Sequence, residues 1–268
     1  MLGKYNILKQ NVANWPAYFF LKWFNKNGTG TFRLRQSGAV LQVPSAMLSV
    51  FKEVFMRNGY DDHFLKAQLP AKAVVLDVGG NIGMFAANVV NMQPQVQVHC
   101  FEPLPNNLAV LQRNATACAA FKAAITVVPS ALTGVPGTHI SFYKNNNEPL
   151  SQSASTIPGF LNNNDCITVP SVQLSAYVAN QGFTSVDLLK LDCEGSEYDI
   201  LYNTSPQVLA LVRAIIVETH FVDAETKNFE ALQAFLETAG FTIVKTHVVD
   251  EGMHLIWATR VQQSKAGS

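Results

Sequence analysis

The chain has 268 residues, of which 48% are hydrophobic and only 14% are charged. This length and composition exclude a disordered, collagen-like or coiled-coil protein, and they allow one large domain or two small ones. Nineteen Lys and Arg residues balance nineteen Asp and Glu residues, so the net charge is +0. We therefore expect no long-range electrostatic attraction to nucleic acid or to an anionic membrane.

The cysteines and the hydropathy pattern indicate the compartment. No cysteine lies in a C-x-x-C pair or at zinc-site spacing from a histidine, so we expect buried thiols in a reducing compartment. The most apolar segment, Trp15–Phe24, is interrupted by Pro16 and Lys22 and is shorter than the ~18 residues of a membrane span. The N-terminus also lacks a signal-peptide pattern, and we expect a cytoplasmic protein. The four cysteines are Cys100, Cys118, Cys166 and Cys193.

The N-terminal third predicts a helix, a hairpin and a second helix. Residues Ile7–Asn25 are expected to be helical and are rich in aromatic side chains. This helix either packs on the body of the domain or forms a lid over an apolar substrate. Thr31–Val43 alternates polar and apolar residues around a Ser-Gly turn, which predicts a hairpin. Ala46–Arg57 has apolar residues at helical spacing.

From Lys72 onward, apolar strands alternate with helices, which indicates a parallel sheet covered on both faces. Two final strands leave no room for a helix between them, so one strand of that sheet must run antiparallel. The predicted strands are Ala73–Val78, Val96–Phe101, Ile125–Val128, Ser185–Leu191, Val212–Glu218, Phe241–Thr246 and Met253–Thr259. Three helices are predicted. One begins near Ile82, and the other two cover Asn106–Ala117 and Asn228–Ala239.

The segment Thr133–Val172 breaks this alternation. It contains one probable strand, Thr138–Tyr143, followed by a polar stretch rich in Asn, Ser and Pro. We interpret it as an insertion at the carboxyl edge of the sheet, where ligands bind. The expected organisation is an N-terminal helix and hairpin cap over residues 1–70, a catalytic domain over residues 71–261, and a tail over residues 262–268.

A glycine-rich loop directly follows the first apolar strand. It does not match the G-x-G-x-x-G pattern of dinucleotide-binding proteins, and the chain has no P-loop. Its spacing is D-x-G-x-x-x-G, in which the glycines let the backbone turn tightly and approach a ligand. Because an acidic residue leads the loop, we expect a cationic ligand with ammonium and sulfonium groups. The candidate binding residues are Asp77, Gly79, Gly80, Asn81 and Gly83.

Three further residues extend this candidate ligand site. Glu102 ends the second strand, where an acidic residue of a doubly wound sheet accepts hydrogen bonds from both ribose hydroxyls of a nucleoside. Ser130 and Ala131 follow the third strand, where an adenine ring would pack.

Acidic residues and a histidine follow the next two strands of the predicted sheet. Asp192 and Glu194 come at the end of the fourth strand, within the run Lys-Leu-Asp-Cys-Glu-Gly-Ser-Glu. Glu218 and His220 end the fifth strand, and residues two apart on a strand point to the same side. Carboxylates are costly to cluster unless they are paired or bind something, so we expect these four residues to form an active site.

These motifs together resemble the FkbM-type family of S-adenosylmethionine-dependent methyltransferases. The resemblance covers about Val74–Ala258 and includes VVLDVGGNIGMFA, FEPLPNNLAVLQRN, SQSASTI, LLKLDCEGSEYDIL and IIVETH, of which KLDCEGSE is the most specific. It implies an α/β class I methyltransferase fold, Rossmann-like and doubly wound, with a seven-stranded sheet whose last strand is antiparallel. It also implies S-adenosylmethionine as cofactor and O-methylation of natural products, sugars or lipids. Gly80 stands where the family usually has Ala.

We therefore expect an O-methyltransferase that needs a base to remove the proton of a hydroxyl group. His220 is the expected base, Glu218 or Asp192 would orient it as in a catalytic triad, Glu194 would order the crevice, and Asp192 would also contact the cofactor. No bound metal is expected on this reading, nor any nucleic-acid partner or membrane span. The acceptor is expected to be a small hydroxylated molecule, such as a polyketide, lipopeptide or sugar, either free or attached to a carrier protein.

Three alternatives remain open at this point. A metal-dependent O-methyltransferase would bind Mg²⁺ or a transition metal through Asp192, Glu194, Glu218 and His220. A non-catalytic adenosyl-binding domain would bind the cofactor without releasing S-adenosylhomocysteine. A nicotinamide oxidoreductase is disfavoured by the spacing of the glycines.

Overall fold

The computed structural model describes residues 3–145, 150–160, 163 and 165–260. The predicted tail over residues 262–268 lies outside the described residues. The chain forms two compact units, each built from several segments. Unit 1 comprises Met1–Ala73, Gly80–Pro129 and Asn146–Gln152, and unit 2 comprises Val74–Gly79, Ser130–Asn145 and Ser153–Ser268. The N-terminal segment thus shares a unit with Gly80–Pro129, while the expected division at residue 70 stays a prediction.

Two short helices occupy the place of the predicted helix over Ile7–Asn25. The break has two causes: Val12 pairs with Leu34 in a β-bridge, and Pro16, which has no N–H to donate, stands directly before the second helix. The two helices bury Leu8, Tyr18 and Leu21 in the core, and Val12 between them is also buried. They are α1 (Gly3–Asn11) and α2 (Ala17–Trp23). The segment therefore packs on the rest of its own unit, which agrees with the first of the two interpretations. Its second interpretation, a lid over an apolar substrate, stays a prediction.

The predicted hairpin and the helix after it are confirmed. Strands β1 (Thr29–Arg33) and β2 (Val40–Pro44) pair antiparallel. The following helical stretch buries Phe51, whose ring stacks on that of Phe32 at 4.2 Å between centroids. That stretch consists of the 3₁₀ turn η1 (Ser45–Met47), α3 (Leu48–Lys52) and the π-helical turn η2 (Glu53–Arg57), and α4 (Asp62–Gln68) follows.

The rest of unit 1 contains two parallel strands and three helices. The hairpin is bound to α6 through Asn114, whose side chain accepts a hydrogen bond from the backbone N–H of Gln42 at 2.8 Å and donates one to its carbonyl oxygen at 3.0 Å. The elements are α5 (Met84–Met92), β4 (Gln97–Phe101), α6 (Pro105–Ala115), α7 (Ala119–Ala124) and β5 (Ile125–Val128). Helix α7 was not predicted from the sequence.

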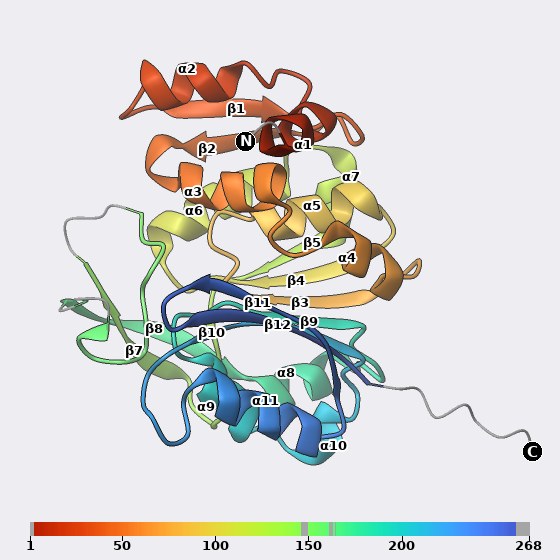
Figure 1. Ribbon diagram of the computed structural model, residues 1–268, viewed down its shortest axis with the longest axis vertical. Coiled ribbons are helices and arrows are strands. Elements are labelled where there is room, and N and C mark those ends of the chain that lie inside the picture. Colours follow the sequence, from red (N-terminus) through yellow and green to blue (C-terminus); the bar gives the residue numbers. More distant parts are fainter. Residues whose placement is uncertain (1–2, 146–149, 161–162, 164, 261–268) are drawn as a thin grey trace, which may run out of the picture. The chain divides into compact units, whose positions relative to one another are not determined.

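Unit 2 holds the strands that carry the acidic motifs. Figure 1 shows α9, α10 and α11 on one side of these strands. The strands are β3 (Val74–Val78), β9 (Leu188–Leu191), β10 (Ala214–His220), β11 (Thr242–Asp250) and β12 (Met253–Thr259). The helices are α8 (Leu174–Gln181), α9 (Glu197–Tyr202), α10 (Pro206–Leu209) and α11 (Phe229–Thr238). Every strand predicted here is present, with ends shifted by a few residues.

Hydrogen bonds link seven strands in the order β11-β12-β10-β9-β3-β4-β5. β3 pairs parallel with β9 and β9 with β10, whereas β12, the last strand of the chain, is antiparallel to both of its neighbours. This confirms the predicted class I methyltransferase topology. From β3 the order proceeds through β4 and β5 in one direction and through β9 and β10 in the other. The carboxyl ends of β3 and β9 therefore lie at the topological switch point, where ligands of such sheets bind.

The predicted insertion folds as a small sheet of its own. Its strands are β6 (Ala131–Thr133), β7 (His139–Lys144) and β8 (Asp165–Gln173), in the order β6-β8-β7. β7 matches the strand predicted over Thr138–Tyr143. β8 was not predicted, because its polar residues alternate with few large apolar ones and only one of its nine residues is buried.

The four cysteines are free thiols, but only Cys100 is buried. Cys166, on the mostly unburied strand β8, is exposed, so the expectation that all four are buried is wrong. Within the part of the chain that the structure describes, no helix is long and apolar enough to cross a membrane.

Candidate active site

A buried lysine connects the ends of β3 and β9. Lys190 stands opposite Asp77 in the parallel register, and its Nζ lies 3.3 Å from Asp77 Oδ1 and 3.4 Å from Asp192 Oδ2. It also donates hydrogen bonds to the carbonyl oxygens of Val78 and Gly79. Asp77 is fully buried, and its charge is thus balanced inside the protein. The acidic start of the loop is therefore weaker support for a cationic ligand than the sequence suggested.

Two glycines after β3 leave no room for side chains. Gly79 has φ +76°, and a Cβ at this position would overlap the carbonyl oxygen of Asp192. A Cβ on Gly80 would overlap Sγ of Cys100. The sulfur of Cys100 fills the space that a methyl group at position 80 would need. This explains why the chain has Gly80 where the family that it resembles usually has alanine.

Glu102 follows β4 and organises the same glycine-rich loop. It is 4% exposed, and its carboxylate accepts hydrogen bonds from the backbone N–H groups of Asn81 and Leu104, both at 2.9 Å. A carboxylate can accept more hydrogen bonds than these two. The position is thus compatible with the predicted role in binding ribose hydroxyls, and it adds a structural role that the sequence analysis did not include.

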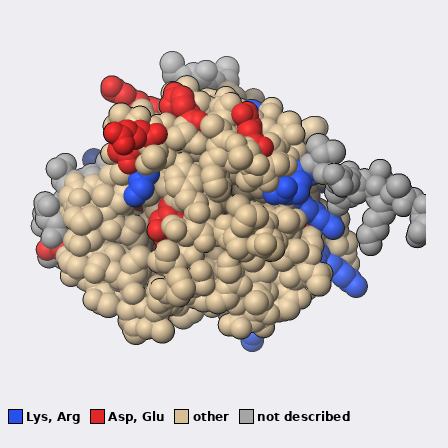
Figure 2. All heavy atoms as spheres, turned by 90° about the horizontal axis from the view of Figure 1, so that it is seen from below, with Lys and Arg blue, Asp and Glu red and all other residues tan. Residues whose placement is uncertain are grey.

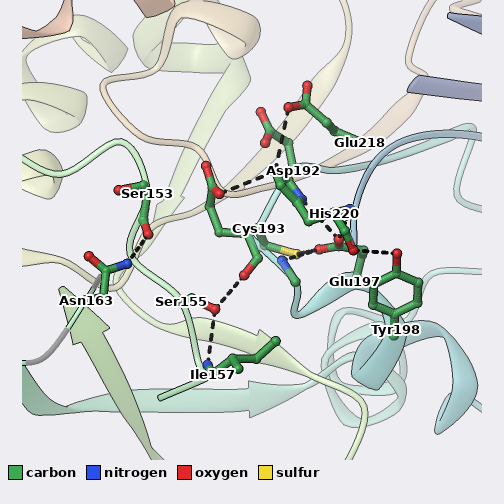
Figure 3. Close-up of polar contacts among 12 residues, drawn as sticks. Ser153, Ser155, Ile157, Asn163, Asp192, Cys193, Glu197, Tyr198, Glu218 and His220 are labelled. Carbon is green, nitrogen blue, oxygen red and sulfur yellow. Dashed lines mark hydrogen bonds and ion pairs between the residues drawn. The ribbon is translucent and has the colours of Figure 1, made fainter. Parts of the chain in front are cut away.

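The acidic motifs of unit 2 converge on His220, as Figure 3 shows. Val217 of β10 pairs with Leu191 of β9, so the ends of the two parallel strands lie side by side. His220 is 1% exposed. Its Nε2 lies 3.3 Å from Glu194 Oε2 and 3.7 Å from Glu218 Oε1. The predicted grouping of His220 with carboxylates is therefore present in the structure.

Glu197, the last acid of the Lys-Leu-Asp-Cys-Glu-Gly-Ser-Glu run and the first residue of α9, is the residue that orients the imidazole. It is fully buried, and its Oε1 accepts hydrogen bonds from both Nδ1 and the backbone N–H of His220, at 3.1 and 3.0 Å. Its Oε2 accepts a third from the backbone N–H of Gly195 at 2.9 Å. The expectation that Glu218 or Asp192 orients the ring is thus corrected. The only signal in the sequence was an acid at the start of a helix, a position that the helix dipole alone explains.

The protonation state of His220 follows from these neighbours. Burial by itself lowers the pKa of the imidazole, but the carboxylates of Glu197, Glu194 and Asp192 raise it to about 10. At neutral pH His220 is therefore an imidazolium. An ordinary imidazole has a pKa of about 6.5, and the sequence did not reveal how many carboxylates surround this ring.

The remaining candidate residues lie around this cluster. Glu194 has φ +54°, and its carbonyl oxygen accepts a hydrogen bond from Ser155 Oγ at 2.5 Å. Ser155 belongs to the SQSASTI motif, so this motif holds the loop between β9 and α9 (Figure 3). Ala131 begins β6 and is buried, and Ser130 directly precedes it. The packing of an adenine ring against these two residues stays a prediction.

Three members of the cluster could also hold a metal ion. Asp192, Glu218 and His220 can each offer one ligand atom, and these atoms all lie within 4.8 Å of one another. His220 Nε2 is buried and makes no hydrogen bond with the described residues. Carboxylate oxygens with an imidazole nitrogen suit divalent ions such as Mg²⁺ or Mn²⁺.

Comparison with known proteins identifies similar sequences. The family model described as "Methyltransferase FkbM domain" matches residues 77–243. The methyltransferase sdnD of Sordaria araneosa is 27% identical over 220 residues, which are 73% of this chain and 82% of that protein. The 31-O-demethyl-FK506 methyltransferase FkbM of Streptomyces tacrolimicus is 29% identical over 241 residues, 80% of this chain and 89% of that protein.

Among solved structures, magnesium protoporphyrin IX methyltransferase (ChlM) from Synechocystis PCC 6803, with bound SAM, has a TM-score of 0.42 and 13% sequence identity. The match covers 74% of this chain and 76% of that one.

Proposed function

The chain belongs to the FkbM methyltransferase family, and from this premise we propose that it transfers a methyl group from S-adenosylmethionine to a hydroxyl oxygen of a natural-product-like acceptor. The observation that carries the proposal is the cluster of Asp192, Glu194, Glu218 and His220 at the ends of β9 and β10, in which Glu218 and His220 are buried and the two others partly exposed. Such a cluster supplies a proton acceptor next to the switch point of the sheet.

Several residues fit S-adenosylmethionine as the cofactor. The side-chain-free turn at Gly79 and Gly80 lets a ligand approach the backbone, and Glu102 offers a buried carboxylate for ribose hydroxyls. When bound, the cofactor supplies a methyl group whose bond to sulfur breaks as its bond to the acceptor oxygen forms. Asp192 is a further candidate contact, because its side chain remains 23% exposed beside Lys190.

The reaction also requires that the hydroxyl proton pass to a base near His220. The imidazolium of His220 can accept that proton only after losing its own, so this base becomes available as the pH rises toward 10. Glu197 holds the ring in place through Nδ1, which leaves Nε2 as the nitrogen that takes the proton. If His220 is not the base, Asp192 is the next candidate in the same cluster.

The acceptor class is supported by the relatives. The name of the Streptomyces tacrolimicus relative gives 31-O-demethyl-FK506 as its substrate, which is a compound named for a missing O-methyl group. We propose a hydroxyl group of a polyketide, lipopeptide or sugar as the acceptor, free or attached to a carrier protein. Incubation of hydroxylated acceptors with S-adenosylmethionine, followed by mass spectrometry, should reveal the gain of one CH₂ unit together with S-adenosylhomocysteine. If no hydroxylated acceptor leads to the release of S-adenosylhomocysteine, the result would instead support a cofactor-binding domain without catalysis.

Replacing Glu102 by alanine is expected to weaken S-adenosylmethionine binding about ten- to a hundred-fold, because charge-assisted hydrogen bonds of about 1.5–3 kcal/mol are lost. Isothermal titration calorimetry measures this effect, with Glu230→Gln on the exposed surface of α11 as the control. Glu102→Gln separates ligand contacts from loop structure, since it keeps one oxygen that can accept the Asn81 N–H. Unchanged affinity in Glu102→Ala would remove the ribose assignment, and preferential binding of NAD would remove the cofactor proposal.

A second candidate function is a metal-dependent O-methyltransferase, and the group formed by Asp192, Glu218 and His220 favours it. A divalent ion at this position would lower the pKa of the acceptor hydroxyl. We expect Mg²⁺ or Mn²⁺ to bind the chelator-treated protein in calorimetry, and Asp192→Asn to weaken that binding at least tenfold. Glu251→Gln, at an exposed position far along the chain, is the matched control. If the chelated protein keeps full activity and binds no measurable metal, the metal-dependent mechanism is excluded and the metal-free mechanism stands.

A further inference from the structure

The net charge of +0 conceals a strong division of charge along the chain. Residues 1–60 contain eight Lys and Arg residues and one acidic residue, Glu53, which gives a net charge of +7. Residues 61–268 contain eleven Lys and Arg and eighteen Asp and Glu, which gives −7. On the face on the side of α9, α10 and α11, several acidic side chains gather in one area (Figure 2). The overall net charge therefore does not describe the N-terminal segment, which is strongly basic.

Several of these N-terminal cations lie close together and beside aromatic rings. Lys22 Nζ is 6.0 Å from the centre of the Tyr18 ring, and Lys9 Nζ is 4.6 Å from that of Trp15. Burial, together with the nearby charges of Arg57, Lys22 and Lys4, lowers the pKa of Lys52. Cations of α1, α2 and η2 thus act on Lys52 of α3 within unit 1, and an anionic partner would offset this repulsion.

Three large aromatic side chains project from the same segment. Phe20, Trp23 and Phe24 are 61%, 56% and 76% exposed. They follow the i, i+3, i+4 spacing of one helix face, whereas Tyr18 and Leu21 anchor the opposite face in the core. The rings of Phe20 and Phe24 stack at 6.1 Å between centroids. The result is an apolar tip on one face of α2, and Lys22 and Lys26, both exposed, are neighbours of these aromatic residues in the sequence.

We propose that this basic aromatic surface, formed by Phe20, Trp23 and Phe24 with Lys4, Lys22, Lys26, Lys52 and Arg57, binds the surface of an anionic lipid bilayer. Trp and Phe side chains favour the boundary between headgroups and acyl chains, and Lys and Arg are attracted to anionic headgroups. A fluid bilayer can take up protruding rings without a preformed complementary pocket, which a protein partner would have to supply. This binding requires no membrane-spanning helix and does not depend on the proposed methyl transfer.

Vesicle sedimentation tests the proposal with the full chain. We expect the protein to bind phosphatidylcholine vesicles that contain about one-third phosphatidylserine, but not pure phosphatidylcholine vesicles, at low ionic strength. Binding should fall steeply at about 0.5 M salt, where surface charges are screened. Each of Lys22→Glu and Lys26→Glu should lower the partition coefficient about fivefold or more.

The aromatic tip is tested separately. Phe20→Ser, Trp23→Ser and Phe24→Ser combined should abolish vesicle binding while leaving the Tm and the S-adenosylmethionine affinity near those of the unaltered protein. Val244→Ser with Val248→Ser is the matched control, because it alters exposed apolar residues on β11 instead, and it should bind vesicles normally. Absence of binding to anionic vesicles at low salt, or normal binding by the aromatic variant, would overturn the proposal. Binding to an anionic oligonucleotide or an acidic carrier protein but not to vesicles would overturn it as well.

Discussion

Replacing His220 by glutamine is expected to lower kcat by about 10²–10⁴-fold, because the acceptor hydroxyl then loses its proton acceptor. Glutamine can still occupy the buried space and donate a hydrogen bond from its amide group to the carboxylate of Glu197, so the fold should persist. The affinity for S-adenosylmethionine should stay within a few fold. His63→Gln, at an exposed position of α4, is the matched control and should leave kcat unchanged.

The direction in which kcat changes with pH tests whether His220 is the base. A base works only when deprotonated, and the pKa of His220 is raised to about 10. In the protein without ligands, only about one imidazole in a thousand is then neutral at pH 7. We therefore expect kcat to increase with pH from 7 toward 10, and this increase should be absent from the residual activity of His220→Gln. A flat profile above pH 6, or a variant with nearly full activity, would transfer the role of base to Asp192.

Glu197→Ala is expected to be the most destabilising single change in the cluster. It removes the carboxylate that accepts hydrogen bonds from Nδ1 and the backbone N–H of His220 and from the backbone N–H of Gly195. Breaking a buried ion pair by removing one partner costs about 3–5 kcal/mol of unfolding free energy. Urea denaturation measures this loss, and Glu230→Gln on the surface of α11 should remain within about 0.5 kcal/mol of the unaltered protein.

The same pair predicts how stability varies with pH. The pKa of His220 in the folded state, about 10, lies above its ordinary value of about 6.5. Its contribution to stability is therefore fully present below about pH 6.5 and is lost as the pH rises through about 10. We expect the free energy of unfolding to decrease over this window, and the more conservative variant Glu197→Gln should show a smaller decrease. An identical pH dependence in the variant would contradict the assignment of Glu197 as the residue that holds the proton on His220.

The sequence by itself determined the sheet and the list of candidate residues. Strands buried on both faces, such as Val74–Val78, consist mostly of apolar residues, and the lack of a helix between the last two strands required an antiparallel pair. The motifs around Asp192 and His220 were readable because residues at the carboxyl ends of neighbouring parallel strands meet at one edge. The division of charge at residue 60 is likewise a property of the sequence alone.

Only the tertiary structure decided how the charges in the site are paired. Lys190 lies in an apolar strand, and nothing local indicated that it would balance Asp77, which is 113 residues away along the chain. In its local sequence Glu197 is a helix N-terminal acid. In the fold, its carboxylate accepts a hydrogen bond from the imidazole of His220, which lies at the end of β10. Likewise, the break between α1 and α2 depends on the pairing of Val12 with Leu34. Local sequence sets backbone preference and polarity, whereas the pKa of a buried group depends on charges that the fold brings within a few ångströms of it.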